Sequence, residues 1–558
     1  MDGALTKRDQ LYTRWGALKS ERATYLAHWK EISDYLLPRN GRFFVQDRNK
    51  GWRRHNNIYD STGTRALRVL GAGLMGGATS PARPWFRLAT ADPDMMDFAP
   101  VKLWLSQVQR GMLDIFQRSN TYRALHSIYE ELGAFGTGAA VVMDDFDDVI
   151  RHHVLTTGEY AIAQNYRGEI VTLYREFDKT VAELVGEFGY DNCSQTVRNM
   201  WDRHQLDQWI TIVHAIEPRA DSERDLRMRD AKNMPWKSVY FERGGDRNQF
   251  LRESGFKQFP ALAPRWAIVG GDIYGSSPGM EALGDVKQLQ HEQLRKAQGI
   301  DYMTKPPLQA PTSMKNRDID MLPGGVTFVD PSAAQAGIRN AFEVRLDLNH
   351  LLADIQDVRG RINQAFYTDL FLMLASAPTN NMTATEVAER HEEKLLMLGP
   401  VLERLHNELL DPLIERTFSR MIETGLVPPP PEELQGVDLN VEYVSMLAQA
   451  QRAVATNGID RFVGNLGALA QFKPDVLDKF DSDKWADAYS DMLGIDPELI
   501  VPNDRVAMIR AQRAQAAQAA QQQAQMAQAA ATAKDAASAG GGGADGLNNV
   551  MQMFTGYQ

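Results

Sequence analysis

A glycine-rich run near the N-terminus has the spacing of a dinucleotide-binding turn. Gly71, Gly73 and Gly76 match that spacing, and Asp92 follows about twenty residues later. Such a turn binds a pyrophosphate only where a strand precedes it and a helix N-terminus follows it. Residues 61–70 have a helical pattern instead, and two prolines follow the run almost at once. We therefore expect the glycines to allow close helix packing or a bend, and we predict no cofactor. A cytosolic dinucleotide-dependent oxidoreductase is kept as the enzymatic alternative.

Two further groups of side chains are of the types that hold metal ions. Four aspartates surround a phenylalanine in residues 144–148, and carboxylate oxygens suit Mg²⁺ or Ca²⁺. The run lacks the glycine and the distal glutamate of a calcium-binding loop, which favours a solvated turn. His152 and His153 are adjacent, so on a strand they point to opposite faces. Other histidines are scattered on predicted helices, at His350, His391 and His406. We predict no metal site and no catalytic residues.

Helices with well-marked starts dominate the chain between residues 270 and 425. Ser277 can cap the first of them, and Pro278 suits the first helical position, where its missing N–H costs nothing. This helix is predicted to run to about Gly299. The segment at 300–339 is rich in proline and glycine, which break helices and sheets, and it contains a short β-prone run. A small mixed subdomain is therefore predicted there.

A second helix is predicted from Asn340, because Glu343 completes a capping box three residues later. Its apolar residues alternate spacings of three and four, which places them on one narrow seam facing a neighbouring helix. The seam consists of Leu348, Leu351, Ile355, Val358 and Ile362. Periodicity alone does not distinguish this helix from any other helix of a bundle.

An apolar stretch and a third helix follow. The stretch at 371–382 is too short to cross a bilayer, which takes roughly 20 residues. The third helix is predicted to start at Thr383, where a glutamate three residues later completes another capping box. Pro400 and Pro412 lie inside it, so we expect a kink or a break.

The first 270 residues combine helices with strands. Helical patterns cover 5–37 and 101–132. Strand-like runs occur at 209–213 and 238–241, and a hairpin is predicted around Gly168. This part of the chain is predicted to be α+β.

Composition excludes several classes of protein. The chain has 558 residues, a net charge of −11 and one cysteine. A general nucleic-acid binder presents basic surface to phosphates, which this acidic balance does not favour. One cysteine cannot form an intrachain disulfide. We find no apolar signal core and no stretch long enough for a membrane span, so we expect synthesis in a cytoplasm-like compartment.

Two groups of residues carry a resemblance to a known family. The first comprises Phe259-Pro260 with Pro264-Arg265-Trp266, followed by Tyr274-Gly275-Ser276-Ser277-Pro278 with Ala282-Leu283, Asp285 and Lys287. The second comprises Met382-Thr383-Ala384-Thr385-Glu386-Val387 with Glu389-Arg390. In this order and spacing the chain resembles the portal, or head–tail connector, proteins of short-tailed phages. The likeness covers roughly residues 7–509 and is weakest in the tail.

The resemblance implies a mainly helical α+β portal fold that assembles as a twelve-membered ring around a central channel. The implied parts are a wing at 1–270, a first stem helix at 271–299, a clip at 300–339, a second stem helix at 340–367, a tunnel loop at 368–382, a long kinked wing helix at 383–430, a crown at 431–504, and a barrel helix with a flexible tail at 505–558. Alanine and glutamine favour helix in that last part, although its low complexity is equally compatible with disorder.

The family also implies a function and partners. A portal lies at a single capsid vertex of the virion, where it nucleates procapsid assembly and forms the conduit for packaging and ejection of double-stranded DNA. Its implied partners are further copies of itself, the terminase large subunit, major capsid and scaffolding proteins, tail adaptor or nozzle proteins, and DNA without sequence specificity. No membrane partner and no cofactor are implied. A different phage head–tail adaptor is the structural alternative, although adaptors are smaller and lack two long stem helices.

Position within that fold suggests two groups of contact residues. In the tunnel loop, the residues expected near DNA are Pro378, Thr379, Asn380, Asn381 and Met382. In the clip, Lys305, Lys315 and Arg317 would meet DNA phosphates or an acidic partner, or would simply be solvated. The sequence has no Gly-x-x-x-x-Gly-Lys-Ser/Thr loop, so the ATP chemistry of packaging is expected to belong to a partner.

Overall fold

The computed structural model shows two compact units. Unit 1 comprises residues 1–88, 107–429 and 441–460, and unit 2 comprises residues 89–106, 430–440 and 461–558. The structure describes residues 6–43, 56–90, 92, 95, 98–225, 227–228, 230–245, 249–305, 308–309, 339–340, 348–375, 397–434, 439–444, 462–469, 472–473, 475, 480–486, 501 and 503–539.

In unit 1 the N-terminal helix packs on an antiparallel sheet. The helix is α1 (Lys7–Tyr35), which confirms the helix predicted there. The sheet is a meander of β4 (Tyr160–Gln164), β5 (Ile170–Thr180), β6 (Trp209–Pro218), β7 (Trp236–Glu242) and β8 (Arg252–Phe256). Gly168, at φ +82°, forms the turn of the predicted hairpin between β4 and β5. Trp15 of α1 stacks on Tyr174 of β5 with 6.1 Å between ring centroids, so the helix and the sheet share one core.

The opposite face of this sheet has its own apolar cover. Ile212 and Tyr240 belong to a second core cluster, whereas their neighbours Val213 and Phe241 belong to the first. Because side chains alternate along a strand, the two clusters lie on opposite faces of the sheet. The second cluster is completed by α5 (Val181–Phe188) and α6 (Gln195–Asp202), and it contains the buried Cys193, which follows the 3-10 turn η2 (Tyr190–Asn192).

Two packed helices and a small sheet form the rest of this body. The helices are α2 (Thr62–Ala78) and α4 (Thr121–Phe135). The sheet has the order β3 (Val149–Leu155), β2 (Ala139–Asp145), β9 (Ala261–Leu262). The helical region predicted at 101–132 consists of α3 (Ala99–Arg118) and α4, which are separated by two residues. Further elements of unit 1 are η3 (Asp221–Glu223) and η4 (Ala231–Asn233). The 3-10 turn η8 (Glu432–Leu434) belongs to unit 2, and β1 (Phe86–Thr90) and β12 (Leu439–Tyr443) each have residues in both units.

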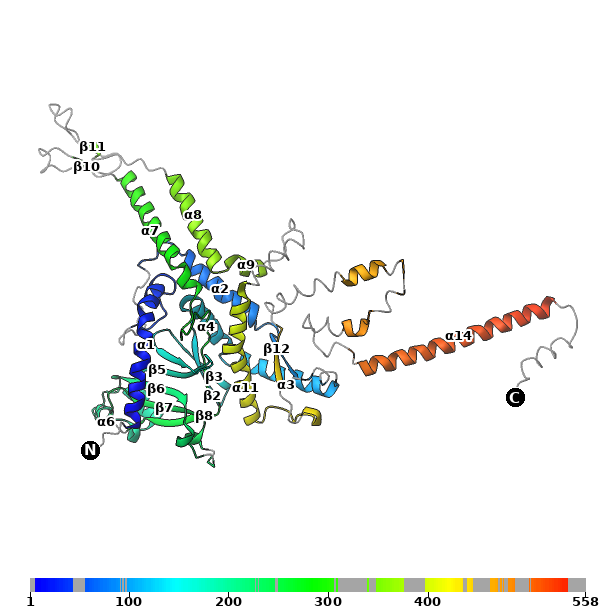
Figure 1. The fold of residues 1–558 in the computed structure, drawn as a ribbon, viewed down its shortest axis with the longest axis horizontal. Helices are drawn as coiled ribbons and strands as arrows, with labels where there is room; N and C mark the ends of the chain where they lie inside the picture. Colours follow the sequence, from blue (N-terminus) through cyan, green and yellow to red (C-terminus); the bar gives the residue numbers. More distant parts are fainter. Residues whose placement is uncertain are drawn as a thin grey trace. The chain divides into compact units, whose positions relative to one another are not determined.

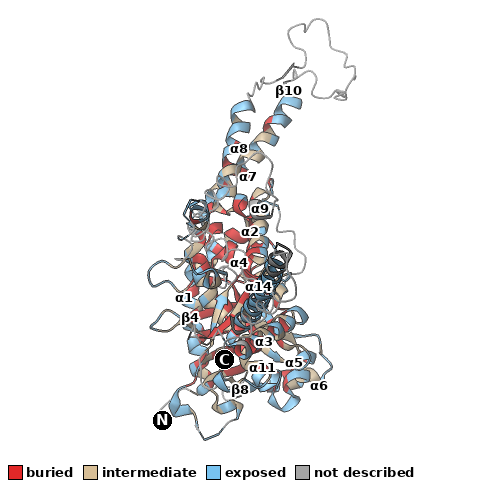
Figure 2. Ribbon diagram, turned by 90° about the vertical axis from the view of Figure 1, so that its right-hand side faces the viewer, coloured by how far each residue is buried: buried red, intermediate tan, exposed pale blue. Residues whose placement is uncertain are grey.

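A pair of long helices extends from the body of unit 1. Figure 1 shows α7 (Pro278–Thr304) and α8 (Leu348–Ala365) side by side, leading away from α2 and α4. Beyond them β10 (Leu308–Gln309) and β11 (Arg339–Asn340) form an antiparallel ladder. Figure 2 shows that α2 and α4 are mostly buried, whereas the far turns of the pair are exposed.

Three predicted boundaries in this region were wrong. Asn340 does not start a helix, because it pairs with Leu308 in the β10–β11 ladder, and α8 begins at Leu348. The first helix does not end at residue 299 but continues to Thr304, so the segment predicted as clip begins with a helical turn. The first eight residues of the predicted tunnel loop form the short helix α9 (Thr368–Ala375), while the rest of that loop lies outside the described residues.

The third predicted helix is described only from residue 397. It is helical over 397–405, then forms a π-helical turn at His406–Leu410, and continues as α11 (Asp411–Glu423). The irregular turn ends two residues before Pro412, whose missing N–H cannot donate to the regular helical ladder. The predicted break in this helix is therefore a π-helical turn. The predicted helix start at Thr383 lies outside the described residues.

In unit 2 the longest described element is α14 (Asn503–Ala539). It confirms the helix predicted in the alanine- and glutamine-rich tail. Its 37 residues span roughly 55 Å at 1.5 Å per residue. Every side chain described from residue 507 to 532 is exposed. Arg510 forms an ion pair with Asp483 of a short helix at 482–486, at 2.5 Å.

Candidate functional site

The start of α7 is fixed to the end of α4 by a polar cap. Ser277 accepts the N–H of Met280 at 3.0 Å, as an N-cap residue does, and its hydroxyl donates to the carbonyl of Ala134 at 2.8 Å. The N–H of Gly275 donates to the Thr137 hydroxyl at 2.9 Å. These bonds confirm the cap predicted at Ser277. They also orient the helix, because the cap is bonded to the body as well as to α7.

Two glycines allow the chain segments at this start to touch. A Cβ atom on Gly275 would lie 2.2 Å from the carbonyl oxygen of Gly136, and a Cβ on Gly136 would lie 2.1 Å from that of Gly275. Gly136 also has φ +77° and ends α4 in the left-handed conformation. Both contacts are with backbone atoms, which no change of rotamer can move. Only glycine fits at either position.

A buried carboxylate joins α8 to the start of α2, at the end of the α7–α8 pair nearer the body, which we call the root of the pair. Asp60 accepts hydrogen bonds from the backbone N–H and hydroxyl of Thr62, and it pairs with Arg359 of α8 at 2.6 Å. Burial alone would raise the pKa of Asp60, but these hydrogen bonds outweigh it and hold the pKa below its ordinary value. The amide of Gln290 on α7 accepts from the N–H of Asp60 at 2.8 Å and donates to its carbonyl at 2.9 Å. Both long helices are thus bound to one short segment.

Sequence reasoning missed Asp60 and Gln290. The Asp-Ser-Thr run ahead of α2 is a local signal, since an aspartate that accepts from an N–H two residues on is common before a helix. No local pattern shows that a glutamine 230 residues later faces it. Two more ion pairs support the root, Arg361 with Asp285 at 3.3 Å and Lys287 with Glu31. These pairs are partly exposed, so each contributes at most about 1 kcal/mol.

The predicted seam of α8 lies largely in the contact with α7. Ile355, Val358 and Ile362 are buried, and Leu351 is partly buried. On α7, Val286 and Leu289 are buried as well. Leu348 starts α8, but its side chain lies outside the description. The two helices pack on each other along this length.

The glycine run near residue 71 lies inside a helix. Residues 69–77 all belong to α2, so no strand–turn–helix arrangement is formed. A Cβ on Gly73 would lie 2.2 Å from the ring of Phe371 on α9, and one on Gly71 would lie 3.0 Å from Glu130 on α4. The interpretation as close helix packing is confirmed for Gly71 and Gly73, whereas a Cβ on Gly76 would have no described atom within 4 Å.

The residues that were weighed as metal ligands make structural contacts. Asp145 accepts the N–H groups of Asp147 and Asp148 at 2.8 and 3.0 Å, which makes the acidic run a hairpin turn. Asp144 lies 3.8 Å from Arg416. His406 stacks on Tyr443 with 3.8 Å between ring centroids. Among the described residues no group of three or more metal-ligating side chains occurs.

The adjacent histidines point to opposite faces, as predicted. His152 is buried, and its Nε2 is 2.9 Å from the Thr121 hydroxyl, whereas His153 is exposed. Burial, reinforced by the nearby Arg416 guanidinium, lowers the pKa of His152 to about 4. The folded protein therefore excludes a proton that the unfolded chain binds below about pH 6.5.

This exclusion predicts a loss of stability in acid. Neutral His152 makes its full contribution to the free energy of unfolding above pH 6.5. This contribution is lost as the pH falls towards 4, at up to about 1.4 kcal/mol per pH unit. We expect His152→Gln to flatten the fall of the urea unfolding free energy between pH 6.5 and 4.5. His350→Gln, an exposed change on α8, is the matched control. Equal slopes for wild type and His152→Gln would contradict the assignment.

Of the residues predicted to contact DNA or a partner, only Lys305 lies within the described residues. Lys305 is exposed at the C-cap of α7, where its N–H donates to the carbonyl of Asp301 at 2.7 Å. The others lie outside the described residues, namely Lys315, Arg317, Pro378, Thr379, Asn380, Asn381 and Met382. No helix among the described residues is long and apolar enough to cross a membrane.

Caps, close glycine contacts and ion pairs hold the α7–α8 pair on an α+β body. The chain belongs to the family of bacteriophage head to tail connecting proteins, whose family model matches residues 8–501. It is 68% identical over 507 residues to a probable portal protein of Bordetella phage BPP-1, with 91% of each chain covered. It is 50% identical over 510 residues to the portal protein of Salmonella phage epsilon15, again with 91% of each chain covered.

A solved structure is also similar, at a much lower level. The neck of an empty gene transfer agent (GTA) particle matches with 12% identity and a TM-score of 0.36, covering 75% of this chain and 89% of the other. A likeness of that size carries no argument about the fold. The family assignment follows from the family model and the two portal proteins.

Proposed function

We propose that the chain assembles as a ring of twelve copies around a channel, with α7 and α8 as the stem. The observation that carries this proposal is the helix pair, which is anchored at its root and carries uncovered apolar side chains further out. Ile300, Met303 and Leu352 are 41%, 49% and 40% exposed in a single copy. Neighbouring copies in a ring would bury them, and burial of apolar surface is the main driving force for association.

The parts beyond the stem would meet DNA and partners. The segment between α7 and α8 would form the clip, where Lys305, Lys315 and Arg317 face first the packaging motor and later the tail proteins. The loop after α9 would bring residues 378–382 near the DNA. The exposed helix α14 would pack with its copies into a barrel, which would cover side chains that one copy leaves in water.

The mechanism of such a ring is geometric. A fixed annulus at one capsid vertex would nucleate shell assembly, dock the terminase motor, and then hold the genome until ejection. The net charge of −11 per chain supports passage of a polyanion, because a weakly repelling wall lets DNA slide. The names of the two related portal proteins support the same role for this chain.

Electron microscopy and light scattering of the purified chain test the ring. We expect annular particles with a mass of about twelve times 62.6 kDa. Replacing the distal apolar side chains by Ile300→Glu and Met303→Glu together should yield folded monomers, since charges do not tolerate burial between copies. Ile422→Glu, at a 54% exposed residue of α11, is the matched control and should still form rings.

Circular dichroism and urea unfolding of the double variant distinguish a protein that fails to fold from one that folds but does not assemble. Rings of normal mass from the double variant would show that Ile300 and Met303 do not lie in a contact between copies. If the wild type stays monomeric at high concentration, at varied salt and with scaffold added, the ring itself is refuted.

A further inference from the structure

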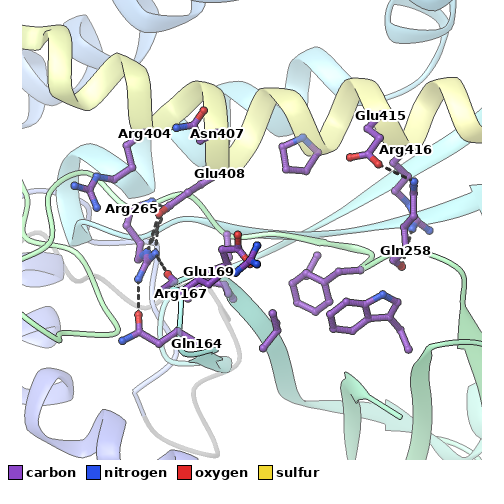
Figure 3. A pocket seen from close by; sticks show the side chains of 18 of the residues that line it. Gln164, Arg167, Glu169, Gln258, Arg265, Arg404, Asn407, Glu408, Glu415 and Arg416 are labelled. Atoms are coloured by element: carbon purple, nitrogen blue, oxygen red, sulfur yellow. Dashed lines mark hydrogen bonds and ion pairs between the residues drawn. The ribbon is translucent and has the colours of Figure 1, made fainter. Parts of the chain in front are cut away.

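A polar groove lies in unit 1, away from the helix pair. Its volume is about 940 Å³, at the upper end of the range for ligand pockets. Figure 3 shows one wall, the helix that carries Arg404, Asn407, Glu408, Glu415 and Arg416. The other walls are the turn between β4 and β5 and the segment at 257–270. The groove therefore lies where three segments that are distant in the sequence meet.

The groove is basic although the chain is acidic. Five cationic and three anionic side chains line it, a net charge of +2 against −11 for the whole chain. The charges of Arg265 and Lys257 are matched by ion pairs with Glu408 and Glu423. Arg416 is held by Asp144, at 3.8 Å, and by the carbonyl of Gln258. Arg404 has no ion pair among the described residues. A guanidinium without an ion pair favours a ligand that carries carboxylates.

The floor of the groove is the unpaired edge of a strand. Among the described residues, β9 is the outer strand of its sheet and pairs only with β2. The carbonyl of Pro260 accepts from the N–H of Val142 in β2 at 2.8 Å, and that of Pro264 accepts from the N–H of Gly138, just before β2, at 3.2 Å. Because bonding alternates along a strand, the backbone groups of Ala261 and Ala263 point away from β2.

Both alanines line the groove and are almost fully buried, with 5% and 4% exposed. Their backbone groups have no hydrogen-bond partner among the described residues. Buried N–H and C=O groups without partners are costly, so this edge is suited to accept a further strand.

We propose that this groove binds an extended acidic peptide segment of a partner protein. The segment would add a strand to the free edge of β9, with main-chain hydrogen bonds to Ala261 and Ala263. A carboxylate of the segment would pair with Arg404 on the helix above. The proposal does not depend on ring formation, since all of these residues lie in unit 1 of one chain.

The chemistry of the groove argues for a partner protein rather than a second copy of this chain. Contacts between permanently associated subunits are predominantly apolar. This groove instead carries charged side chains on each of its walls. Charged and main-chain contacts suit a segment that binds and leaves, with an affinity that falls as salt is added.

A labelled synthetic peptide tests the proposal on the full chain. The probe is fluorescein-labelled Ala-Glu-Val-Glu-Val-Glu-Ala, capped at both ends and followed by fluorescence anisotropy. We expect saturable binding with a Kd of roughly 1–100 μM that weakens with salt. A peptide with lysine in place of glutamate should not bind. The acidic peptide with N-methyl groups on its valine amides should bind about tenfold more weakly, because it cannot pair with a strand edge.

Variants connect binding to the groove. Arg404→Glu should weaken binding at least about tenfold, whereas Arg203→Glu, the same charge change at an exposed site of unit 1, should have no effect beyond salt screening. Equal binding of acidic and basic peptides, no effect of N-methylation, or no binding up to roughly 1 mM would each overturn the proposal. If Arg404→Glu changes the mass of the assembled protein by light scattering, the groove belongs to a second copy and the proposal is likewise overturned.

Discussion

Gly275→Ala is expected to prevent the chain from reaching its native fold. The added methyl group would lie 2.2 Å from the carbonyl oxygen of Gly136, so the start of α7 would have to move away from the end of α4. That movement breaks the bonds of Ser277 to Ala134 and of Gly275 to Thr137. The expected loss exceeds about 3 kcal/mol of unfolding free energy, the upper end of the usual cost of overpacking. It should appear as insoluble protein or as a greatly lowered urea midpoint.

A second glycine of α7 provides the matched control. No atom of the described residues lies within 4 Å of the position of a Cβ on Gly284, so Gly284→Ala should stabilise the chain by about 0.5–1 kcal/mol through helix propensity. Gly136→Ala should repeat the defect of Gly275→Ala, with added strain from its positive φ. A soluble Gly275→Ala protein with a wild-type urea midpoint would show that the two backbones do not touch as described.

Arg265→Met is expected to cost about 3–5 kcal/mol, the usual penalty for removing one partner of a buried ion pair. The guanidinium of Arg265 is 2% exposed and pairs with Glu408 at 2.7 Å. It also donates to the carbonyl of Gly168 at 2.6 Å and to the side chain of Gln164 at 3.0 Å. Methionine fills similar space but removes the guanidinium donors of the Gly168 carbonyl and of the Glu408 carboxylate, which keeps the backbone N–H of position 265. Urea unfolding followed by tryptophan fluorescence, at one protein concentration, measures the loss.

The double variant separates pairing from packing. Arg265→Met with Glu408→Met removes both charges, so it should recover part of the stability that Arg265→Met loses. Arg265→Lys should fall between wild type and Arg265→Met, because one ammonium cannot reach the acceptors that a guanidinium bridges. A loss below about 1 kcal/mol for Arg265→Met would mean that water replaces the guanidinium at low cost.

Sequence patterns predicted what depends on near neighbours in the chain. The cap at Ser277, the strand placement of His152 and the packing role of the glycines near residue 71 all follow from residues within one or two turns. The predicted start of the second helix was wrong because that prediction, too, rested on near neighbours alone. A capping box at Asn340 is a local signal, whereas its pairing with Leu308 is made by a residue about thirty positions away.

The contacts that build the candidate sites are not local. Gln290 meets Asp60 across 230 positions, and Arg265 meets Glu408 across 143. The groove needs three segments to come together, so no window of sequence displays it. The one hint was indirect, since Arg265 belongs to the residues that carried the resemblance to portal proteins.

The packing of α1 has a consequence for the order of events during synthesis. Arg8 of α1 donates to the carbonyl of Glu242, 234 residues later, and Trp15 packs on strands that follow residue 160. A ribosome that adds roughly 5–20 residues per second needs roughly 10–50 s to cover that distance. During this interval α1 has left the ribosome with its apolar side uncovered. The meander from β4 to β8 pairs neighbours in the chain and can close as it emerges, so it is the template on which the first helix finally docks.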